Sequence, residues 1–203
     1  AAYVNLNNLY KLSPEYFDMW VQILSAVAGS RLSLLALPAD AAPYLMEHAK
    51  RIPGGAKGRV QLVQMLPKEQ HLERASVADV FLDTGLVNAH TTAMDVLWAC
   101  LPPVTHAHER FSSRVGASVL HAIGCVHTLA RTTEDYVDVA IRLGKSRAAA
   151  ARVRACIQAG KAGERLFDTG RWVRDFERTL RMLVDAHVRD GDVHKHLRPA
   201  SVD

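Results

Sequence analysis

The stretch LDTGLVNAHTTAMDVLWACLPPVTH, residues 82–106, decides how the rest of the chain is interpreted. It begins with the end of an apolar run, which stops at Asp83-Thr84, and continues through a polar loop to His90. An apolar pattern of helical period follows, and a second short apolar run starts near residue 103. This order of strand, helix and strand predicts a βαβ unit with two parallel strands.

The same alternation extends back to the start of the chain and predicts an α/β fold with a doubly wound, Rossmann-like parallel sheet. The expected strands are residues 3–6, 33–37, 60–64, 80–83, 103–105 and 126–129. The expected helices between them are residues 14–27, 41–51, 67–75, 91–100 and 113–122. Ser13 before Pro14 and Glu15 is typical of a helix N-terminus, because serine caps free N–H groups and proline fits the first turn.

Beyond residue 132 only helical patterns follow, at residues 134–143, 146–159 and 171–189. We therefore expect a core at residues 1–132, C-terminal helices at residues 133–189 that pack on the same domain, and a flexible tail at residues 190–203. The chain starts with strand-like residues and without an initiator Met. We interpret it as a piece of a longer protein.

The composition favours one globular domain without a membrane segment. The chain has 203 residues, of which 49% are hydrophobic, and this is enough for one full-sized core. Its net charge of +4 is spread among 21 acids and indicates only a mild preference for anionic partners. No apolar run approaches the roughly 18 residues that suggest a membrane-spanning helix. The basic segment 142–161 lacks aromatic side chains for base stacking, so we expect a solvated face more readily than a lipid or nucleic-acid patch.

The cysteines and histidines suggest neither disulfides nor a metal. Cys100, Cys125 and Cys156 are odd in number and widely spaced, which is typical of reduced thiols in an intracellular protein. The histidine pairs within residues 106–108 and 194–196 lack Cys or carboxylate partners at metal-ligand spacing. We expect no metal.

The expected sheet also locates a site. With the strand order 3-2-1-4-5-6, ligands bind beyond the carboxyl ends of the strands, where the order reverses between the first and fourth strands. The loop after the first strand holds Asn8 and Lys11, and the loop after the fourth holds residues 88–92. The connection at residues 66–75 must cross the same crevice. Three polar segments therefore converge.

Thr91 and Thr92 stand where the helix at residues 91–100 is expected to begin, and a helix N-terminus with two hydroxyls suits a phosphate. Asp95 lies one turn further on the same face and could accept hydrogen bonds from the two hydroxyls of a ribose. The alternatives are that Thr91 only caps the helix and that Asp95 only complements the helix dipole.

Lys11 could neutralise a phosphate as a point charge, although a solvated loop lysine is the more common case. Lys68, His71 and Arg74 recur at helical spacing and could meet a base and a ribose, or could form an exposed helix face. The sequence has neither G-x-G-x-x-G nor G-x-x-x-x-G-K-[ST], so it lacks the phosphate-binding motifs of dinucleotide and P-loop proteins.

Taken together, five segments resemble successive motifs of one family. They are NLNNLYKLSP (5–14), LPKEQHLERASVADVFLDT (66–84), HTTAMDVLWA (90–99), SSRVGAS (112–118) and EDYVDVAIRLG (134–144). In order and spacing they are similar to the C-terminal catalytic half of the eukaryotic-type protein O-GlcNAc transferases, which have the GT-B fold. The resemblance covers roughly residues 3–189 and is far more specific than any single motif.

The resemblance implies an inverting, metal-independent glycosyltransferase with UDP-GlcNAc as donor and no cofactor. The implied roles are diphosphate contacts for Lys11, uridine contacts for Lys68, His71 and Arg74, phosphate contacts for His90, Thr91 and Thr92, and ribose contacts for Asp95. Lys11 and His90 are the implied catalytic residues. Asn8 is an implied donor contact that stands where the family usually has glutamine, and Ala93 stands where it usually has glycine.

The resemblance also implies acceptors that are Ser and Thr hydroxyls of nuclear and cytoplasmic proteins. An N-terminal catalytic half and tetratricopeptide repeats are expected elsewhere in the same protein, and the 203 residues alone are expected to be inactive. Two alternatives stay open: a related transferase that uses GDP-fucose, and an inactive nucleotide-sensing or scaffold module.

Overall fold

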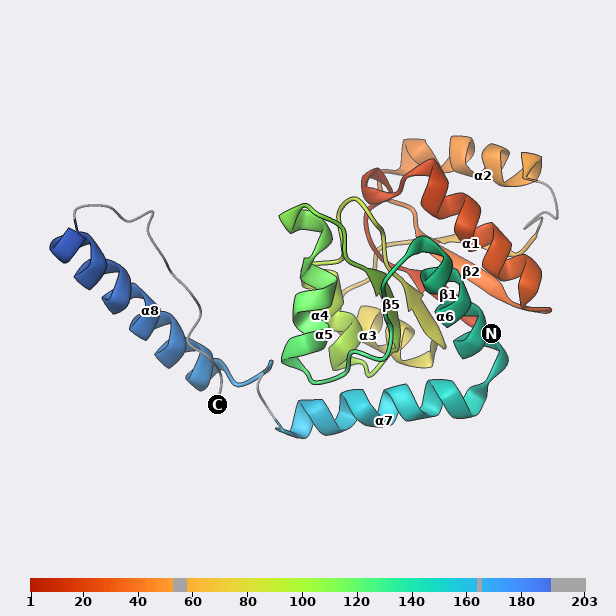
Figure 1. Cartoon of the computed structure of the whole chain (residues 1–203). Coiled ribbons are helices and arrows are strands. Elements are labelled where there is room, and N and C mark those ends of the chain that lie inside the picture. The colour runs from red at the N-terminus through yellow and green to blue at the C-terminus, as the bar shows by residue number, and fades with distance from the viewer. Residues whose placement is uncertain (53–57, 164–165, 191–203) are drawn as a thin grey trace. The chain divides into compact units, whose positions relative to one another are not determined.

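The computed structural model describes residues 1–52, 58–163 and 166–190. Its described residues form a six-stranded sheet in the order β3-β2-β1-β4-β5-β6, with every neighbouring pair parallel (Figure 1). The strands are β1 (Ala2–Asn5), β2 (Arg31–Leu35), β3 (Val60–Val63), β4 (Val80–Leu82), β5 (Pro103–His106) and β6 (Leu129–Ala130). The predicted doubly wound α/β sheet and its strand order are confirmed.

The helices fill the connections, as the alternating pattern predicts. They are α1 (Pro14–Ala26), α2 (Ala42–Arg51), α3 (Lys68–Val77), α4 (Thr91–Trp98), α5 (Val115–Ala122), α6 (Thr133–Lys145), α7 (Arg147–Gly163) and α8 (Thr169–Asp190). Three short 3-10 helices add η1 (Leu9–Lys11), η2 (Ala39–Ala41) and η3 (Phe111–Ser113). The Ser13 cap is confirmed, because its hydroxyl accepts from the Tyr16 N–H at 3.5 Å and Pro14 opens α1.

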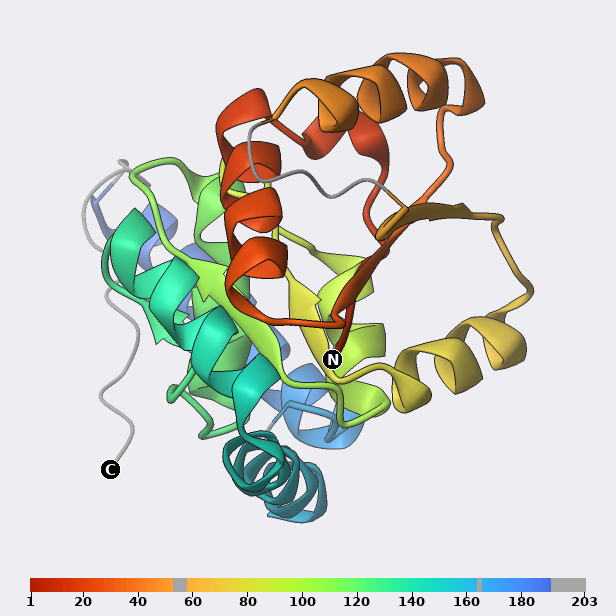
Figure 2. The same cartoon turned by 90° about the vertical axis from the view of Figure 1, so that its right-hand side faces the viewer.

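Helices cover both faces of the sheet (Figure 2). On one face α1 packs against α6, and on the other α3 and α5 pack against α4. The core between the layers includes the fully buried rings of Tyr3, Trp20 and Tyr136. The Trp20 indole N–H donates to the Tyr136 hydroxyl at 2.9 Å, and this hydroxyl donates to the Asp83 carbonyl at 2.8 Å. This chain of bonds ties α1 and α6 to the end of β4.

Two expectations are corrected. The last strand begins at Leu129 and not at residue 126, because the Leu129 N–H closes a turn on the Val126 carbonyl at 3.1 Å. Cys125 and Cys156 form a disulfide with a Cα–Cα distance of 6.0 Å, so the prediction of reduced thiols is wrong for this pair. The two residues are 31 positions apart, and only the packing of α7 brings them together. Cys100 is a free thiol.

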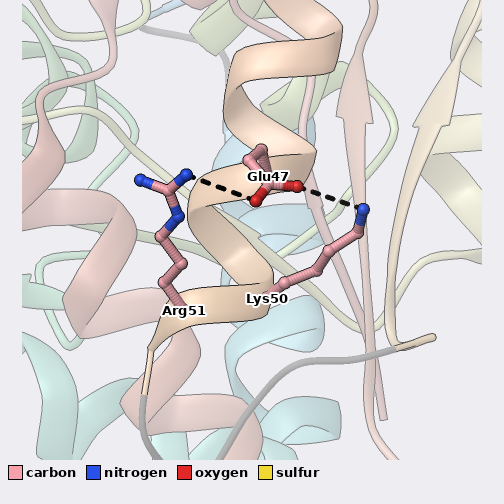
Figure 3. Close-up of polar contacts among 3 residues, drawn as sticks. All are labelled: Glu47, Lys50 and Arg51. Carbon is pink, nitrogen blue, oxygen red and sulfur yellow. Dashed lines mark hydrogen bonds and ion pairs between the residues drawn. The ribbon is translucent and has the colours of Figure 1, made fainter.

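The C-terminal half of α2 carries charged side chains that face solvent. Glu47 pairs with Lys50 at 3.2 Å and with Arg51 at 3.3 Å along one side of the helix (Figure 3). All three side chains are at least half exposed. Exposed pairs of this kind contribute little to stability, because water screens them and ordering long side chains costs entropy.

Contacts divide the chain into two units, Ala1–Leu166 and Phe167–Asp203. In the first unit α6 packs on α1, β4, β5 and β6, and α7 packs on α6. In the second unit α8 carries stacked rings of Trp172 and Phe176, with centroids 5.0 Å apart. The predicted boundary at residue 132 lies inside the first unit, and residues 191–203 of the expected tail lie outside the described residues. Among the helices that the structure describes, none combines the length and apolarity needed to cross a membrane.

Candidate functional site

The carboxyl ends of β1 and β4 lie side by side, since Tyr3 is in register with Val80 and Val4 with Phe81. The loop after β1 continues into η1, and the loop after β4 leads to α4. Lys11, the last residue of η1, donates from Nζ to the Asn88 carbonyl at 3.0 Å. The structure thus brings the predicted lysine to the predicted loop, although 77 residues separate them in the sequence.

The buried carboxylate of Asp83 connects the segments that follow these two strands. The Asp83 side chain is 2% exposed, and its Oδ1 accepts from the backbone N–H groups of Thr84 at 2.9 Å and Ala89 at 2.7 Å. Its Oδ2 accepts from the Thr105 hydroxyl at 2.7 Å, and Asn7 Nδ2 lies 3.4 Å from Oδ1. Burial raises the pKa of Asp83 to about 6, against the opposing effect of these donors. Asp83 therefore joins β1, β5 and both ends of the loop before α4.

Asn88 holds the middle of the same loop. Its Nδ2 donates to the Thr84 carbonyl at 2.7 Å, its Oδ1 accepts from the Gly116 N–H at 3.2 Å, and its own N–H donates to the Ser112 carbonyl at 2.8 Å. Because the side chain and the N–H of Asn88 are both hydrogen-bonded, the orientation of its peptide group is fixed. The Asn88 carbonyl therefore points toward the Lys11 ammonium. Residue 88 was predicted only as part of a polar loop, and its role depends on contacts with distant segments.

Gly116 makes the close packing of α5 under this network possible. A Cβ at this position would lie 2.4 Å from Thr105 Oγ1 and 2.9 Å from Asp83 Oδ2. Any side chain would therefore displace the donor–acceptor pair that Thr105 and Asp83 form. One polar atom of the network, Asn7 Oδ1, is buried without a hydrogen-bond partner among the described residues.

The N-terminus of α4 is open to a ligand. The N-cap residue is His90, not Thr91, and no side chain forms a capping hydrogen bond there. His90 Nε2 instead lies 3.2 Å from the carbonyl of Ser112, which belongs to η3. Thr91 is exposed and Thr92 is half-buried. The alternative that Thr91 merely caps the helix is not what the structure shows, and the first N–H groups of α4 can serve an anion.

A second group of predicted residues meets between α3 and α4. Lys68 Nζ forms an ion pair with Asp95 Oδ1, and His71 Nε2 lies 3.6 Å from Asp95 Oδ2. Arg74 donates from Nη1 to the Gln64 carbonyl at 2.7 Å, and its Nη2 lies 3.4 Å from His71 Nδ1. Asp95 is outside the first turn of α4, so these cations, and not the helix dipole, are its partners.

The charge state of His71 suits contact with a neutral ring. Burial lowers its pKa most, Arg74 and Lys68 lower it further, and Asp95 acts in the opposite direction. The imidazole is therefore neutral at pH 7. If Nδ1 accepts from Arg74, the proton is on Nε2, which can donate toward Asp95.

The predicted residues thus form two groups, Lys11 with residues 88–92 and Lys68, His71 and Arg74 with Asp95. No hydrogen bond or ion pair that the structure describes joins them. The Asn8 carbonyl accepts from the Lys11 N–H at 3.1 Å, but the Asn8 side chain contacts neither group, since its Nδ2 donates to the Tyr10 hydroxyl at 3.3 Å. Within the described ranges no three His, Cys, Asp or Glu side chains are grouped so that they could hold a metal ion. His106 and His108 both contact the Tyr16 hydroxyl, at 3.4 and 2.9 Å.

Comparisons with known proteins agree with this geometry. Residues 1–176 match the family described as Glycosyl transferase family 41. A Caenorhabditis elegans UDP-N-acetylglucosamine--peptide N-acetylglucosaminyltransferase is 37% identical over 179 residues, which are 88% of this chain and 16% of that protein. A probable enzyme of the same description from Arabidopsis thaliana, SEC, is 34% identical over 193 residues, 95% of this chain and 20% of that protein.

A solved structure gives the same result. A mutant of the Thermobaculum terrenum O-GlcNAc transferase superposes with a TM-score of 0.83 at 28% identity, over 89% of this chain and 35% of that one. The chain therefore spans about a third of that structure and about a fifth or less of the two curated relatives. Family match, identity and superposition all point to the predicted resemblance. The chain belongs to glycosyl transferase family 41.

Proposed function

We propose that this chain forms the donor-binding half of an inverting, metal-independent glycosyltransferase that moves GlcNAc from UDP-GlcNAc to Ser or Thr hydroxyls of proteins. One observation carries the proposal: the Lys11 ammonium is held at the Asn88 carbonyl, beside an α4 N-terminus that no side chain caps. A fixed cation next to free N–H groups is suited to the diphosphate of a nucleotide sugar. The relatives named above are UDP-GlcNAc enzymes.

In the proposed reaction the acceptor hydroxyl oxygen attacks the anomeric carbon of GlcNAc and releases its proton. The bond from that carbon to the β-phosphate oxygen breaks, its electron pair leaves with UDP, and the configuration inverts. Negative charge grows on the β-phosphate, where Lys11, His90 and the N–H groups and hydroxyls at Thr91 and Thr92 stabilise it. Donors placed before the reaction lower the barrier because they need no reorganisation.

The uridine is proposed to bind between α3 and α4. Asp95 would exchange its contacts with Lys68 and His71 for the two ribose hydroxyls, since a carboxylate accepts both hydrogens. The neutral His71 ring would lie against the uracil, and Lys68 and Arg74 would flank the nucleoside. Nucleotide binding therefore opens an ion pair that is present without ligand.

The nucleotide preference tests the proposal directly. UDP should stabilise the full-length protein in a thermal-shift assay more than GDP or ADP at equal concentration, because a ligand that binds only the folded state raises the melting temperature. Preference for GDP would favour fucose transfer from GDP-fucose. An absence of stabilisation by all three would favour an inactive scaffold module.

Metal independence has its own test. Lys11 and the α4 N-terminus provide the positive charge that a divalent ion supplies in other transferases. Transfer of GlcNAc to an acceptor peptide should therefore persist in EDTA. Loss of activity with EDTA and its return with Mg²⁺ or Mn²⁺ would contradict this assignment.

The partners and the cellular location are proposed from the family resemblance of the sequence motifs. The rest of the protein would supply the sugar pocket, the acceptor groove and the tetratricopeptide repeats, so these 203 residues alone should bind UDP and transfer nothing. Turnover by the isolated chain would contradict that placement of the site. We propose nuclear and cytoplasmic acceptors. The Cys125–Cys156 disulfide is unusual for these compartments, so cell fractionation with thiol labelling tests the location.

A further inference from the structure

The two helices that form the nucleoside end of the proposed donor site, α3 and α4, are joined by side chains at two levels. Both return from the carboxyl end of one parallel strand to the amino end of the next, so they run in the same direction and pack side by side. On the ligand side, Lys68 and His71 of α3 contact Asp95 of α4. The nucleotide is proposed to open this contact, so only contacts elsewhere can hold the helices together when the site is occupied.

A single guanidinium joins the C-terminal ends of the same two helices. Arg154 of α7 donates from Nη1 to the carbonyl of Cys100, two residues after α4, at 3.2 Å, and from Nη2 to the carbonyl of Ala78, the C-cap residue of α3. Arg154 is half-buried, although it belongs to the segment 142–161 that was expected to form a solvated face. Carbonyls at helix C-termini carry partial negative charge and lack intrahelical donors, so a planar guanidinium can serve two of them at once.

Two further contacts fix α7, from which Arg154 extends. The disulfide between Cys125 and Cys156 ties α7 to the turn after α5, two residues beyond Arg154. One helical turn later Gly160 packs closely on the same turn, because a Cβ there would lie 2.2 Å from the Ile123 carbonyl oxygen. In both views α7 is at the end of the first unit away from α2 (Figures 1 and 2). The guanidinium is therefore held by a helix that has its own attachment to the sheet domain.

The spacing of α3 and α4 determines the width of the nucleoside end. In the proposed complex His71 of one helix lies against the uracil, and Asp95 of the other accepts from the ribose hydroxyls. Ala78 directly precedes Asp79 and β4, and Cys100 precedes β5, so Arg154 acts at the amino ends of the strands. The ligand is proposed to bind at the carboxyl ends. The contacts of Arg154 therefore persist when the nucleotide displaces the ion pair on the ligand side.

We propose that Arg154 is a positioning residue for nucleoside recognition, because it holds the C-terminal ends of α3 and α4 together and thereby sets the distance between His71 and Asp95. The inference rests on the proposed function, in which these two residues bind the uridine. Arg154 touches no ligand itself. Its loss should raise the KM for UDP-GlcNAc and leave kcat nearly unchanged, because a nucleoside is bound equally in substrate and transition state.

The experiment compares Arg154→Met with Lys161→Met in the full-length protein by calorimetry, at a temperature where both variants are folded. Each variant removes one positive charge from α7 and keeps an apolar stem. Lys161 also donates to a helix-end carbonyl, that of Trp98 at 2.7 Å, but its described contacts are with α4 alone. Arg154→Met should weaken UDP about fivefold or more and leave pyrophosphate as in wild type. Lys161→Met should bind both ligands as wild type does.

A measurement without nucleotide separates this inference from the donor-site assignment. An NMR titration of the His71 imidazole reports the spacing, because burial is the largest cause of its lowered pKa. In Arg154→Met the pKa of His71 should rise toward its ordinary value of 6.5, and in Lys161→Met it should stay as in wild type. Failure of wild type to bind UDP would contradict the proposed function, whereas the pKa of His71 still decides the spacing role.

Three results would overturn the role of Arg154. The first is an unchanged pKa of His71 in Arg154→Met. The second is an equal loss of UDP and pyrophosphate binding, which would indicate a general loss of structure. The third is the same weakening of UDP in Lys161→Met, which would assign the effect to the charge of α7 and not to the bridge between α3 and α4.

Discussion

The phosphate end and the nucleoside end of the proposed donor site are built differently. At the phosphate end, Lys11 reaches a carbonyl whose loop is held by the buried Asp83. At the nucleoside end, Asp95 is held only by side chains of a neighbouring helix, and Lys68 is mostly exposed. The first arrangement exists before ligand binds, whereas the second must exchange partners.

This difference suggests separate roles: the phosphate end contributes mainly to catalysis, and the nucleoside end mainly to recognition of the nucleotide. Charge that develops in the transition state is stabilised best by groups that do not move, and the Asp83 network provides such a support. A nucleoside is held equally in substrate and transition state, so its contacts can form on binding. Substitutions at the two ends should therefore affect kcat and affinity to different extents.

The largest effect is expected for Lys11→Ala. The variant removes a preorganised charge at the leaving group, so kcat should fall by about 10²- to 10³-fold, or about 3–4 kcal/mol in the barrier. The melting temperature should hardly change, because Lys11 is only partly buried and makes one hydrogen bond to the loop. Steady-state kinetics with Lys50→Ala as the surface control checks this. Near-normal turnover would contradict the role of the phosphate end.

Asp83→Ala tests whether the phosphate end depends on its buried support. It leaves four donors without their acceptor, so the free energy of unfolding should fall by about 2–4 kcal/mol. Asp83→Asn keeps an acceptor for the two N–H groups and should lose much less. Urea denaturation at pH 7 compares them. Equal stability of wild type and Asp83→Ala would show that Asp83 does not support the phosphate end.

The same residue predicts a pH dependence. The pKa of Asp83 in the folded protein is about 6, above its ordinary value of 3.8, so the folded state binds the proton more tightly. Its contribution to stability is complete below pH 3.8 and is lost as pH rises through about 6. Between these pH values wild type should lose stability relative to Asp83→Asn, which does not titrate there. Parallel stability curves for the two proteins would show that Asp83 has an ordinary pKa.

The smallest effect is expected for Asp95→Asn at the nucleoside end. An amide accepts through only one of its polar atoms, so UDP should bind about tenfold more weakly. Pyrophosphate, which has no ribose, should bind as before, and the melting temperature should change little. Calorimetry with both ligands measures the difference. Equal weakening of the two would place Asp95 outside the ribose contacts.

The alternation of strand-like and helical segments was sufficient to predict most strands and helices, because periodicity and caps such as Ser13 act within a few residues. The order of the strands came from the common topology of doubly wound sheets. It failed where a turn interrupts an apolar run, as at His127 and Thr128 before β6. The Cys125–Cys156 pair was also missed, since widely spaced cysteines carry no information on distance. Family motifs pointed to Lys11, His71 and Asp95, but an acid that ends a buried strand, Asp83, gave no comparable signal.

By itself the sequence determined the class of fold, the family and the residue types available at each strand end, because these depend on local pattern and on motifs in register. Only the tertiary structure decided which of these residues meet. Lys11 and Asn88 are 77 positions apart, and Lys68 and Asp95 are 27 apart, in contacts that exist because parallel strands align their ends. Burial of Asp83 and the unpaired hydroxyl of Thr128 likewise arise from packing between distant segments, since the solvent exposure of a side chain is a property of the folded chain.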